Sequence, residues 1–134
     1  MKYVLFAVAI AIPAAAQSLS TTDLAVLAPS QVTGFSPAQI GAMSTTQLNA
    51  FTTTDMAALT TGQVAGLTAA EFLGISATNF TALTATQIGS LLPGQVPLLT
   101  TTEVSELTIP ALNAMSTTDI EAITQIAPKT SVSR

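Results

Sequence analysis

The stretch Ser44-Thr45-Thr46-Gln47-Leu48-Asn49-Ala50-Phe51 is the unit that decides the fold. Its pattern recurs in steps of eight residues, without an insertion or deletion, from Ser20 to Ile123. This gives thirteen units, which we number 1 to 13, each with places one to eight. Self-similarity at a fixed period is the sequence signature of a repeat architecture, in which each unit buries its apolar side chains against its neighbours.

Two places are apolar in every unit. The fifth place holds Leu24, Val32, Ile40, Leu48, Met56, Val64, Phe72, Phe80, Ile88, Val96, Val104, Leu112 and Ile120. The eighth place holds Leu27, Phe35, Met43, Phe51, Leu59, Leu67, Ile75, Leu83, Leu91, Leu99, Leu107, Met115 and Ile123. The seventh place is Gly, Ala or Ser in ten units, so backbones are expected to approach closely there.

The first and fourth places are polar in a complementary way. The first is Ser or Thr in eleven units, with Ala28 and Leu92 as exceptions, and the fourth is Gln, Asp, Glu or Asn in all but one, which has Ala111. Ser or Thr is a good helix N-cap, and Gln or Glu three residues later completes a capping box, whereas Asp or Asn would do so less well. An eighth-place residue and the fifth place of the next unit then form a hydrophobic staple.

The prolines agree with one short helix per unit. Pro29, Pro37 and Pro93 fall at the first helical position, where proline is tolerated, and Pro110 falls in the first turn. Pro97, at the sixth place, is expected to shorten or bend its helix.

Three other architectures compete with the short helices. A continuous helix is disfavoured because its apolar stripe would rotate by about 80° per unit and encircle the rod. Disorder is disfavoured by a hydrophobic content of 49%. A β-solenoid stays open because threonine favours strands, although apolar places three residues apart face opposite sides of a strand. We predict an all-α solenoid of thirteen short capped helices, with a β-solenoid as the alternative.

The positions of the acidic fourth-place residues have two interpretations, a coil of two units or a chance distribution. All five lie in odd-numbered units: Asp23, Asp55, Glu71, Glu103 and Asp119. Two units per coil would place them along one edge, and thirteen units would then form a rod of about 60 Å.

The first and last residues lie outside the repeat. Residues 1–16 resemble a secretory signal peptide, with Lys2, the apolar run Val4–Ile12 and small residues before Ala16. This predicts cleavage after Ala16 and a protein that is secreted, at the cell surface or in the periplasm. The remaining chain divides into a solenoid at residues 17–123 and a polar tail at residues 124–134.

Charge and cysteine content exclude several partners. The chain has a formal net charge of −4 and no cysteine, and no Lys or Arg occurs between Gln17 and Pro128. Binding to nucleic acid or to an anionic membrane requires cationic groups that the repeat does not have. We therefore expect no nucleic-acid partner and, after signal removal, no membrane.

Candidate chemistry is sparse. Histidine is absent, so no base in the repeat activates the many hydroxyls. Two carboxylate pairs stand out, Glu103 with Glu106 and Asp119 with Glu121, but neither has the Asp, Asn and Gly density of a calcium loop. Solvated charges at helix starts, stabilised by the helix dipole, explain them better. We expect no catalytic, cofactor-binding or metal-binding residues and no enzymatic activity.

The octads resemble the Thr-, Gln- and Ala-rich octapeptide arrays, of the form Leu-Thr-Thr-x-Gln-Val-x-Ala, of exported and surface proteins of bacteria. The stretches Leu59–Leu67 and Leu83–Leu91 match that pattern best, and Leu92, Pro97 and Ile109–Ala111 depart from it. The resemblance covers most of the chain, but it implies a repeat type and no activity.

A regular, weakly charged scaffold without reactive groups predicts a structural or interaction module of the cell envelope or extracellular space. Its expected partners are further copies of itself or another envelope or extracellular protein. The alternative is an ice- or surface-binding protein that uses regular threonine pairs, such as Thr45-Thr46, Thr53-Thr54 and Thr101-Thr102.

Overall fold

The computed structural model describes residues 19–126, and each of the thirteen units in this range contains one short helix. The helices are α3 (Thr21–Ala25), α4 (Pro29–Val32), α5 (Pro37–Ile40), α6 (Thr45–Leu48), α7 (Thr53–Ala58), α8 (Thr61–Ala65), α9 (Ala69–Gly74), α10 (Ala77–Thr81), α11 (Ala85–Gly89), the 3₁₀ helix η1 (Val96–Leu98), α12 (Thr101–Ser105), α13 (Ile109–Ala114) and α14 (Thr117–Ile126). Within residues 19–126 there is no strand. The short-helix solenoid is therefore confirmed, and the β-solenoid is excluded.

The caps form as the sequence predicts. In unit 4, the Ser44 hydroxyl accepts a hydrogen bond from the Gln47 N–H at 3.1 Å, and Gln47 Oε1 accepts one from the Ser44 N–H at 2.9 Å. All eleven first-place Ser and Thr side chains accept such a bond from the fourth-place N–H. Each of these eleven helix starts is thus fixed by the first and fourth residues of its own unit.

Shorter acidic side chains cap less closely, also as predicted. The cap N–H lies 3.3, 3.0 and 3.1 Å from the carboxylates of Asp23, Asp55 and Asp119. The corresponding distance to a fourth-place Gln or Glu is 2.6 to 2.9 Å. Asn79 does not reach its cap, and the Ser76 N–H donates instead to Asn49 Oδ1 at 2.8 Å.

Unit 10 is the most irregular unit. Leu92 has no side-chain acceptor, but its N–H donates to Gln95 Oε1 at 2.8 Å. Pro97 lies inside the helical turn that follows, and this turn is the 3₁₀ helix η1 instead of an α-helix. The predicted shortening at Pro97 is therefore confirmed, and its cause is the missing N–H and the steric demand of the ring.

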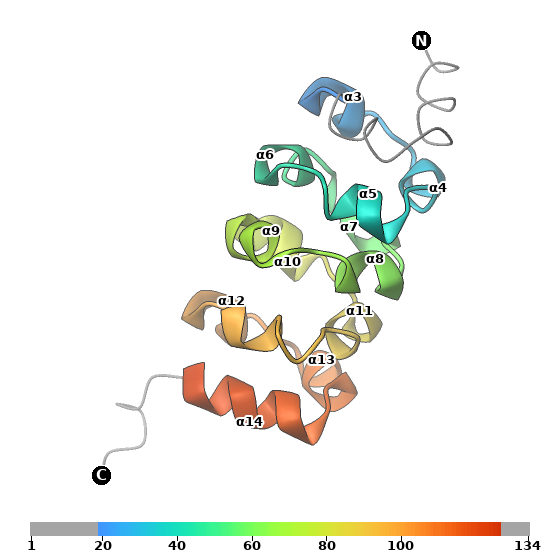
Figure 1. Cartoon of the computed structure of the whole chain (residues 1–134). Coiled ribbons are helices and arrows are strands. Elements are labelled where there is room, and N and C mark those ends of the chain that lie inside the picture. The colour runs from blue at the N-terminus through green and yellow to red at the C-terminus, as the bar shows by residue number, and fades with distance from the viewer. Residues whose placement is uncertain (1–18, 127–134) are drawn as a thin grey trace.

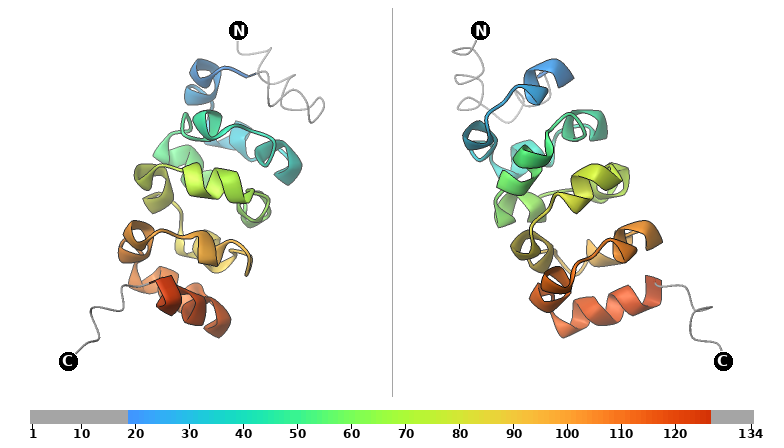
Figure 2. Two further views of the ribbon diagram at one scale, coloured as in Figure 1. Left: turned by 60° about the vertical axis from the view of Figure 1, so that its left-hand side comes forward. Right: turned by 180° about the vertical axis from the view of Figure 1, so that it is seen from behind.

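The helices stack in three columns because each contacts the helix three units away. The first column contains α3, α6, α9, η1 and α14, the second contains α4, α7, α10 and α12, and the third contains α5, α8, α11 and α13. One coil therefore has three units, or 24 residues. The expectation of two units per coil is wrong. The coils follow one another along a single axis in Figures 1 and 2, with α3 at one end and α14 at the other.

The acidic residues are distributed differently as a result. Asp23, Glu71 and Asp119 belong to the first column, whereas Asp55 and Glu103 belong to the second, so they do not form one charged edge. At about 9 Å between stacked helices, four and a third coils make a rod of about 40 Å instead of 60 Å.

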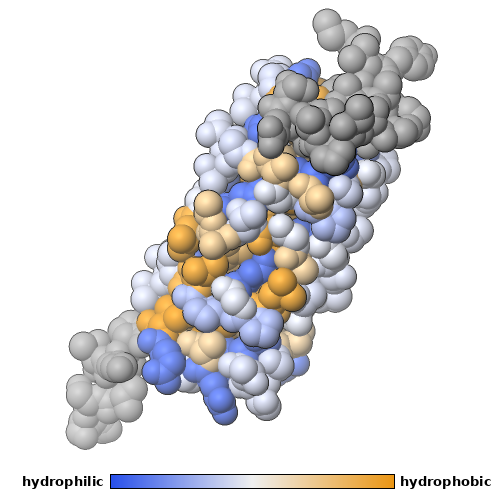
Figure 3. Space-filling view, viewed as in Figure 1, coloured by the Kyte–Doolittle hydropathy of each residue, from blue (hydrophilic) through white to orange (hydrophobic). Residues whose placement is uncertain are grey.

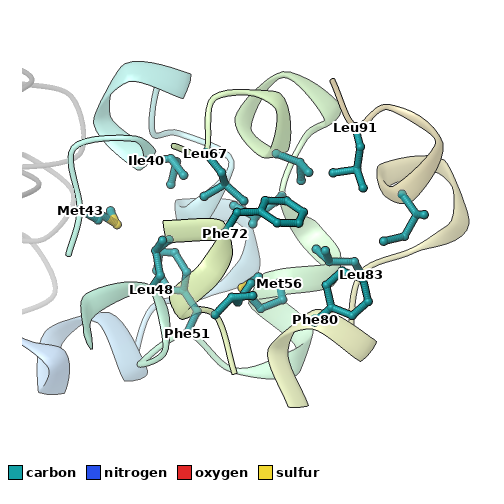
Figure 4. Packing of buried hydrophobic residues seen from close by; sticks show 14 of the residues in the cluster. Ile40, Met43, Leu48, Phe51, Met56, Leu67, Phe72, Phe80, Leu83 and Leu91 are labelled. Carbon is teal, nitrogen blue, oxygen red and sulfur yellow. The ribbon is translucent and has the colours of Figure 1, made fainter. Parts of the chain in front are cut away.

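The apolar places form one continuous core. Every fifth- and eighth-place side chain of units 1 to 10 is buried. Only Val104, Leu107, Leu112 and Ile120, in the last described coil, are half-buried. Figure 4 shows such side chains converging from successive helices on a shared interior. Helices of three to ten residues are unstable alone, so this shared core stabilises them.

Small residues allow the coils of the third column to approach closely. A Cβ atom added at Gly41 would lie 2.5 Å from the carbonyl oxygen of Gly66, and one added at Gly66 would lie 2.8 Å from that of Pro37. Gly41 has φ −70°, a backbone angle that any residue adopts. Glycine is therefore required here because a side chain has no space beside the Gly66 carbonyl, and not because of the backbone angle. The predicted close approach at the seventh place is found at Gly66. Its partner in the neighbouring coil is Gly41, a sixth-place residue.

The last helix continues beyond its unit. Helix α14 extends to Ile126, three residues into the segment predicted as the polar tail. The predicted signal peptide at residues 1–16 and residues 127–134 lie outside the described residues. Among residues 19–126, no helix is long and apolar enough to cross a bilayer.

Candidate functional site

The structure separates the members of each carboxylate pair. Glu103 is buried at the start of α12, where its Oε2 accepts hydrogen bonds from the Thr100 N–H at 2.7 Å and from the Thr100 hydroxyl at 2.8 Å. Glu106 caps the other end of that helix and is exposed. Asp119 and Glu121 repeat this division between buried cap and exposed surface in α14. In each pair one carboxylate is therefore committed to a helix cap.

The acidic fourth-place residues are not solvated. Asp55 is fully buried and Glu71 is 3% exposed, while Glu103 and Asp119 are also buried. Only Asp23, in the first unit, is half-exposed. For the two carboxylate pairs, the predicted exposure to water is found at Glu106 and Glu121, whereas Glu103 and Asp119 lie at helix starts as predicted but are buried. The preceding coil covers the acidic fourth-place residues, since the fourth place faces the coil before it, and only Asp23 has no such coil among the described residues. Among residues 19–126, no three His, Cys, Asp or Glu side chains cluster as metal ligands would.

The fourth place has a second role that the sequence analysis missed. The side-chain oxygen of a fourth-place Gln accepts the cap N–H. The NH₂ group of the same side chain donates to main-chain carbonyls of the preceding coil. Gln63 Nε2 donates to the carbonyl oxygens of Val32 at 2.8 Å and Phe35 at 2.6 Å. These acceptors lie 31 and 28 residues earlier, at the fifth and eighth places of the unit four positions back.

The same bond recurs along the array, and we call this set of bonds the amide ladder. Its other members are Gln47 to Leu19, Asn79 to Leu48, Gln87 to Met56 and Leu59, and Gln95 to Val64 and Leu67. The distances from amide nitrogen to carbonyl oxygen range from 2.6 to 3.2 Å along the ladder. Since these amides are buried, the ladder satisfies polar groups that would otherwise carry a desolvation cost.

One sequence signal could have revealed the ladder. A capping box accepts Glu and Gln equally, yet the fourth place holds six Gln and only two Glu. The excess indicates that the site needs a donor as well as an acceptor. A carboxylate supplies only the acceptor.

The carboxylates at ladder positions show the consequence. Asp55 Oδ1 and Glu71 Oε1 are buried oxygens without a hydrogen-bond partner in the structure. By the ladder spacing, the oxygen of Glu71 takes the place of an amide nitrogen opposite the carbonyls of Ile40 and Met43. Acceptor then faces acceptor, which destabilises the contact between these coils.

Replacing Glu71 by Gln should therefore stabilise the protein. The new Nε2 would donate to the Ile40 and Met43 carbonyls while Oε1 keeps the cap, and the free energy of unfolding should rise by about 1 to 2 kcal/mol. Urea denaturation followed by circular dichroism measures this change. Glu121→Gln alters the same charge at an exposed position, and equal stabilisation by both variants would contradict the ladder explanation.

The exposed surface consists mainly of hydroxyl and small side chains. Between residues 19 and 126 no Lys or Arg is present. Figure 3 shows one pale face with small apolar patches between hydrophilic ones. At the third place of the second column, all four units present an exposed hydroxyl: Ser30, Thr54, Thr78 and Thr102.

The threonine pairs themselves do not form an unbroken row. Thr45-Thr46 lies in the first column, where Ala69-Ala70 follows in the next coil. Thr53-Thr54 and Thr101-Thr102 lie in the second column, with Ala77-Thr78 between them.

Comparison with known proteins finds a similar repeat family. A family model described as the ALTTAQ repeat matches residues 35–69. This stretch is therefore similar to a known repeat array. The matched residues include helices α5 to α8, so the matched stretch contains units that show both the capping box and the amide ladder. No curated protein and no solved structure matches the chain.

Proposed function

We propose that the protein is an exported structural or interaction module, which acts by presenting a regular surface and by associating with further copies of itself. The observation that carries the proposal is that the polar side chains at the first and fourth places are used in hydrogen bonds within the fold. The first-place Ser and Thr side chains and the fourth-place Gln, Asp and Glu side chains are engaged in caps and in the amide ladder, so the array presents a regular shape with exposed hydroxyls and small apolar groups. We likewise propose that it has no enzymatic activity.

The last described coil supports self-association. Leu107, Leu112 and Ile120 occupy core places there but are only half-buried. Inside the array, where a further coil follows, equivalent side chains are buried. A coil of a second copy has the spacing of apolar side chains that fits this surface. Such head-to-tail contacts produce open chains of molecules instead of closed dimers.

Sedimentation velocity of the purified chain tests the self-association. We expect the sedimentation coefficient to rise with concentration for the native chain and to stay at the monomer value for Leu112→Gln, because the polar side chain would be desolvated in the contact. Leu73→Gln, at an exposed apolar residue of α9, is the matched control and should associate like the native chain. A native chain that stays monomeric at every concentration would contradict the proposal.

The export proposal rests on residues 1–16 and has a separate test. N-terminal sequencing of the protein recovered from the medium or envelope of expressing bacteria should begin at Gln17. A chain found only in the cytoplasm with Met1 retained would exclude export and leave self-association untouched.

The alternative is binding to ice or to a similarly ordered surface. The observation that favours it is the row of exposed hydroxyls at Ser30, Thr54, Thr78 and Thr102, which repeats once per coil. Thermal hysteresis no greater than that of a buffer control would exclude the ice-binding version.

A further inference from the structure

A small cavity lies between helices α10, α11, α12 and α13. Its volume is about 30 Å³, and it is lined by Phe80, Leu83, Ile88, Glu106, Leu107 and Ala111, together with two threonines. Ligand pockets for drug-sized molecules measure about 300 to 1,000 Å³, so this cavity is far too small for a whole ligand of that kind. It has room for one small chemical group.

The spacing of the amide ladder explains why the cavity exists. Fourth-place amides donate to carbonyls 31 and 28 residues earlier, as Gln63 and Gln87 do. Counting back from Ala111, the fourth-place residue of unit 12, these acceptors are the carbonyls of Phe80 and Leu83. Both residues line the cavity. The methyl group of Ala111 fills none of the space that a glutamine amide occupies in other units.

The helix around Ala111 is otherwise normal. The Ala111 N–H donates to the Thr108 hydroxyl at 3.3 Å, so the cap of α13 is intact. What is lost is the side-chain amide: the oxygen that would accept the Thr108 N–H and the NH₂ group that would donate to the ladder carbonyls. The cavity is therefore an amide site of the ladder that lacks its amide, and its NH₂ donor in particular.

The lining defines the chemistry of an occupant. By the ladder spacing, the Phe80 and Leu83 carbonyls offer two acceptors, and Glu106, which is exposed, adds a carboxylate to the lining. No Lys or Arg from residues 19–126 is present to neutralise that carboxylate. Phe80, Ile88 and Leu107 supply apolar walls. A small group with several N–H donors, a positive charge and an apolar stem satisfies all three features.

We propose that this cavity binds a primary ammonium group, carried by a small free amine or by the end of a lysine side chain. Two N–H donors replace the missing glutamine NH₂ at the Phe80 and Leu83 carbonyls, and the positive charge faces Glu106. The site lies between helices of successive coils, and it shares Leu107, but neither Leu112 nor Ile120, with the surface that the proposed self-association uses.

Amide chemical shifts of the full chain provide the test. Because a single functional group binds weakly, the titrations with ethylammonium chloride and with N-acetyl-lysine amide should extend to about 100 mM. We expect saturable shifts at residues 80–84 and 106–111 with at least one of them. Sodium chloride and tetramethylammonium chloride, which have no N–H donor, should give none. Saturation by only one ligand identifies the source of the ammonium group.

Three variants locate the binding. Ala111→Gln places an amide in the cavity and should weaken binding by about tenfold or more. Glu106→Gln, at an exposed residue, should weaken it by several-fold through loss of charge. Ala57→Gln adds the same side chain at an exposed place of α7 and should leave binding unchanged. Absence of saturable shifts, equal shifts with tetramethylammonium, or unchanged binding by both Ala111→Gln and Glu106→Gln would overturn the proposal.

Discussion

Replacing Gln63 by Glu should lower the free energy of unfolding by about 3 kcal/mol at neutral pH. Gln63 is 1% exposed, and its Nε2 lies 2.8 and 2.6 Å from the carbonyl oxygens of Val32 and Phe35. A glutamate keeps the cap of the Thr60 N–H, since that bond uses Oε1. It loses both ladder bonds, however, and sets a buried carboxylate oxygen against two carbonyl oxygens.

Urea denaturation monitored at the helical circular dichroism bands measures this loss. Gln31→Glu is the matched control, because Gln31 is half-buried in the second unit and makes the cap bond at 2.8 Å without a preceding coil among the described residues to accept a ladder bond. We expect its cost to be below about 1 kcal/mol. Similar losses for the two variants would show that the ladder adds nothing beyond the caps.

Replacing Gly41 by Ala should lower the free energy of unfolding by about 2 to 3 kcal/mol. The added Cβ would lie 2.5 Å from the Gly66 carbonyl oxygen, and that obstacle is main chain, which no rotamer change relieves. Separating the coils to make room would strain the neighbouring ladder bonds. The effect is opposite to the usual gain in stability when alanine replaces a helical glycine.

Gly94→Ala is the control for this substitution. A Cβ at Gly94 meets no atom within 4 Å, so alanine there should leave stability within about 0.5 kcal/mol of the native chain. Hydrogen exchange gives a second readout, because Gly41→Ala should raise exchange in α5 and α8 before other helices. If both alanine variants were equally stable, close contact between coils would not explain the glycine at residue 41.

The local structure could be predicted almost entirely from the sequence. Caps, staples and the shortened helix at Pro97 depend on residues within one unit or on its immediate neighbour, so an eight-residue pattern contains the information. The number of units per coil depends instead on the angle between successive helices, which several weak loop and packing terms set together. The five acidic residues lie in odd-numbered units, but this placement does not determine how many units form a coil. The inference of two units per coil was therefore wrong.

The amide ladder was missed for a related reason. Its bonds join residues 28 and 31 apart, and no local signal gives that separation before the coil size is known. The sequence shows the excess of Gln over Glu at the fourth place, but a capping box alone already accounts for Gln there. Once the spacing is measured, the same rule explains the unpartnered oxygen of Glu71 and the cavity beside Ala111.

Three units per coil also govern how such an array tolerates changes in length. Gain or loss of 24 residues adds or removes a full coil, and every later side chain keeps its face of the rod. A change of eight residues preserves each helix but turns the remainder of the molecule by a third of a revolution. Duplication of three octads should therefore lengthen the protein and leave each later residue on the same face. Insertion or deletion of a single octad should instead change which residues contact a partner.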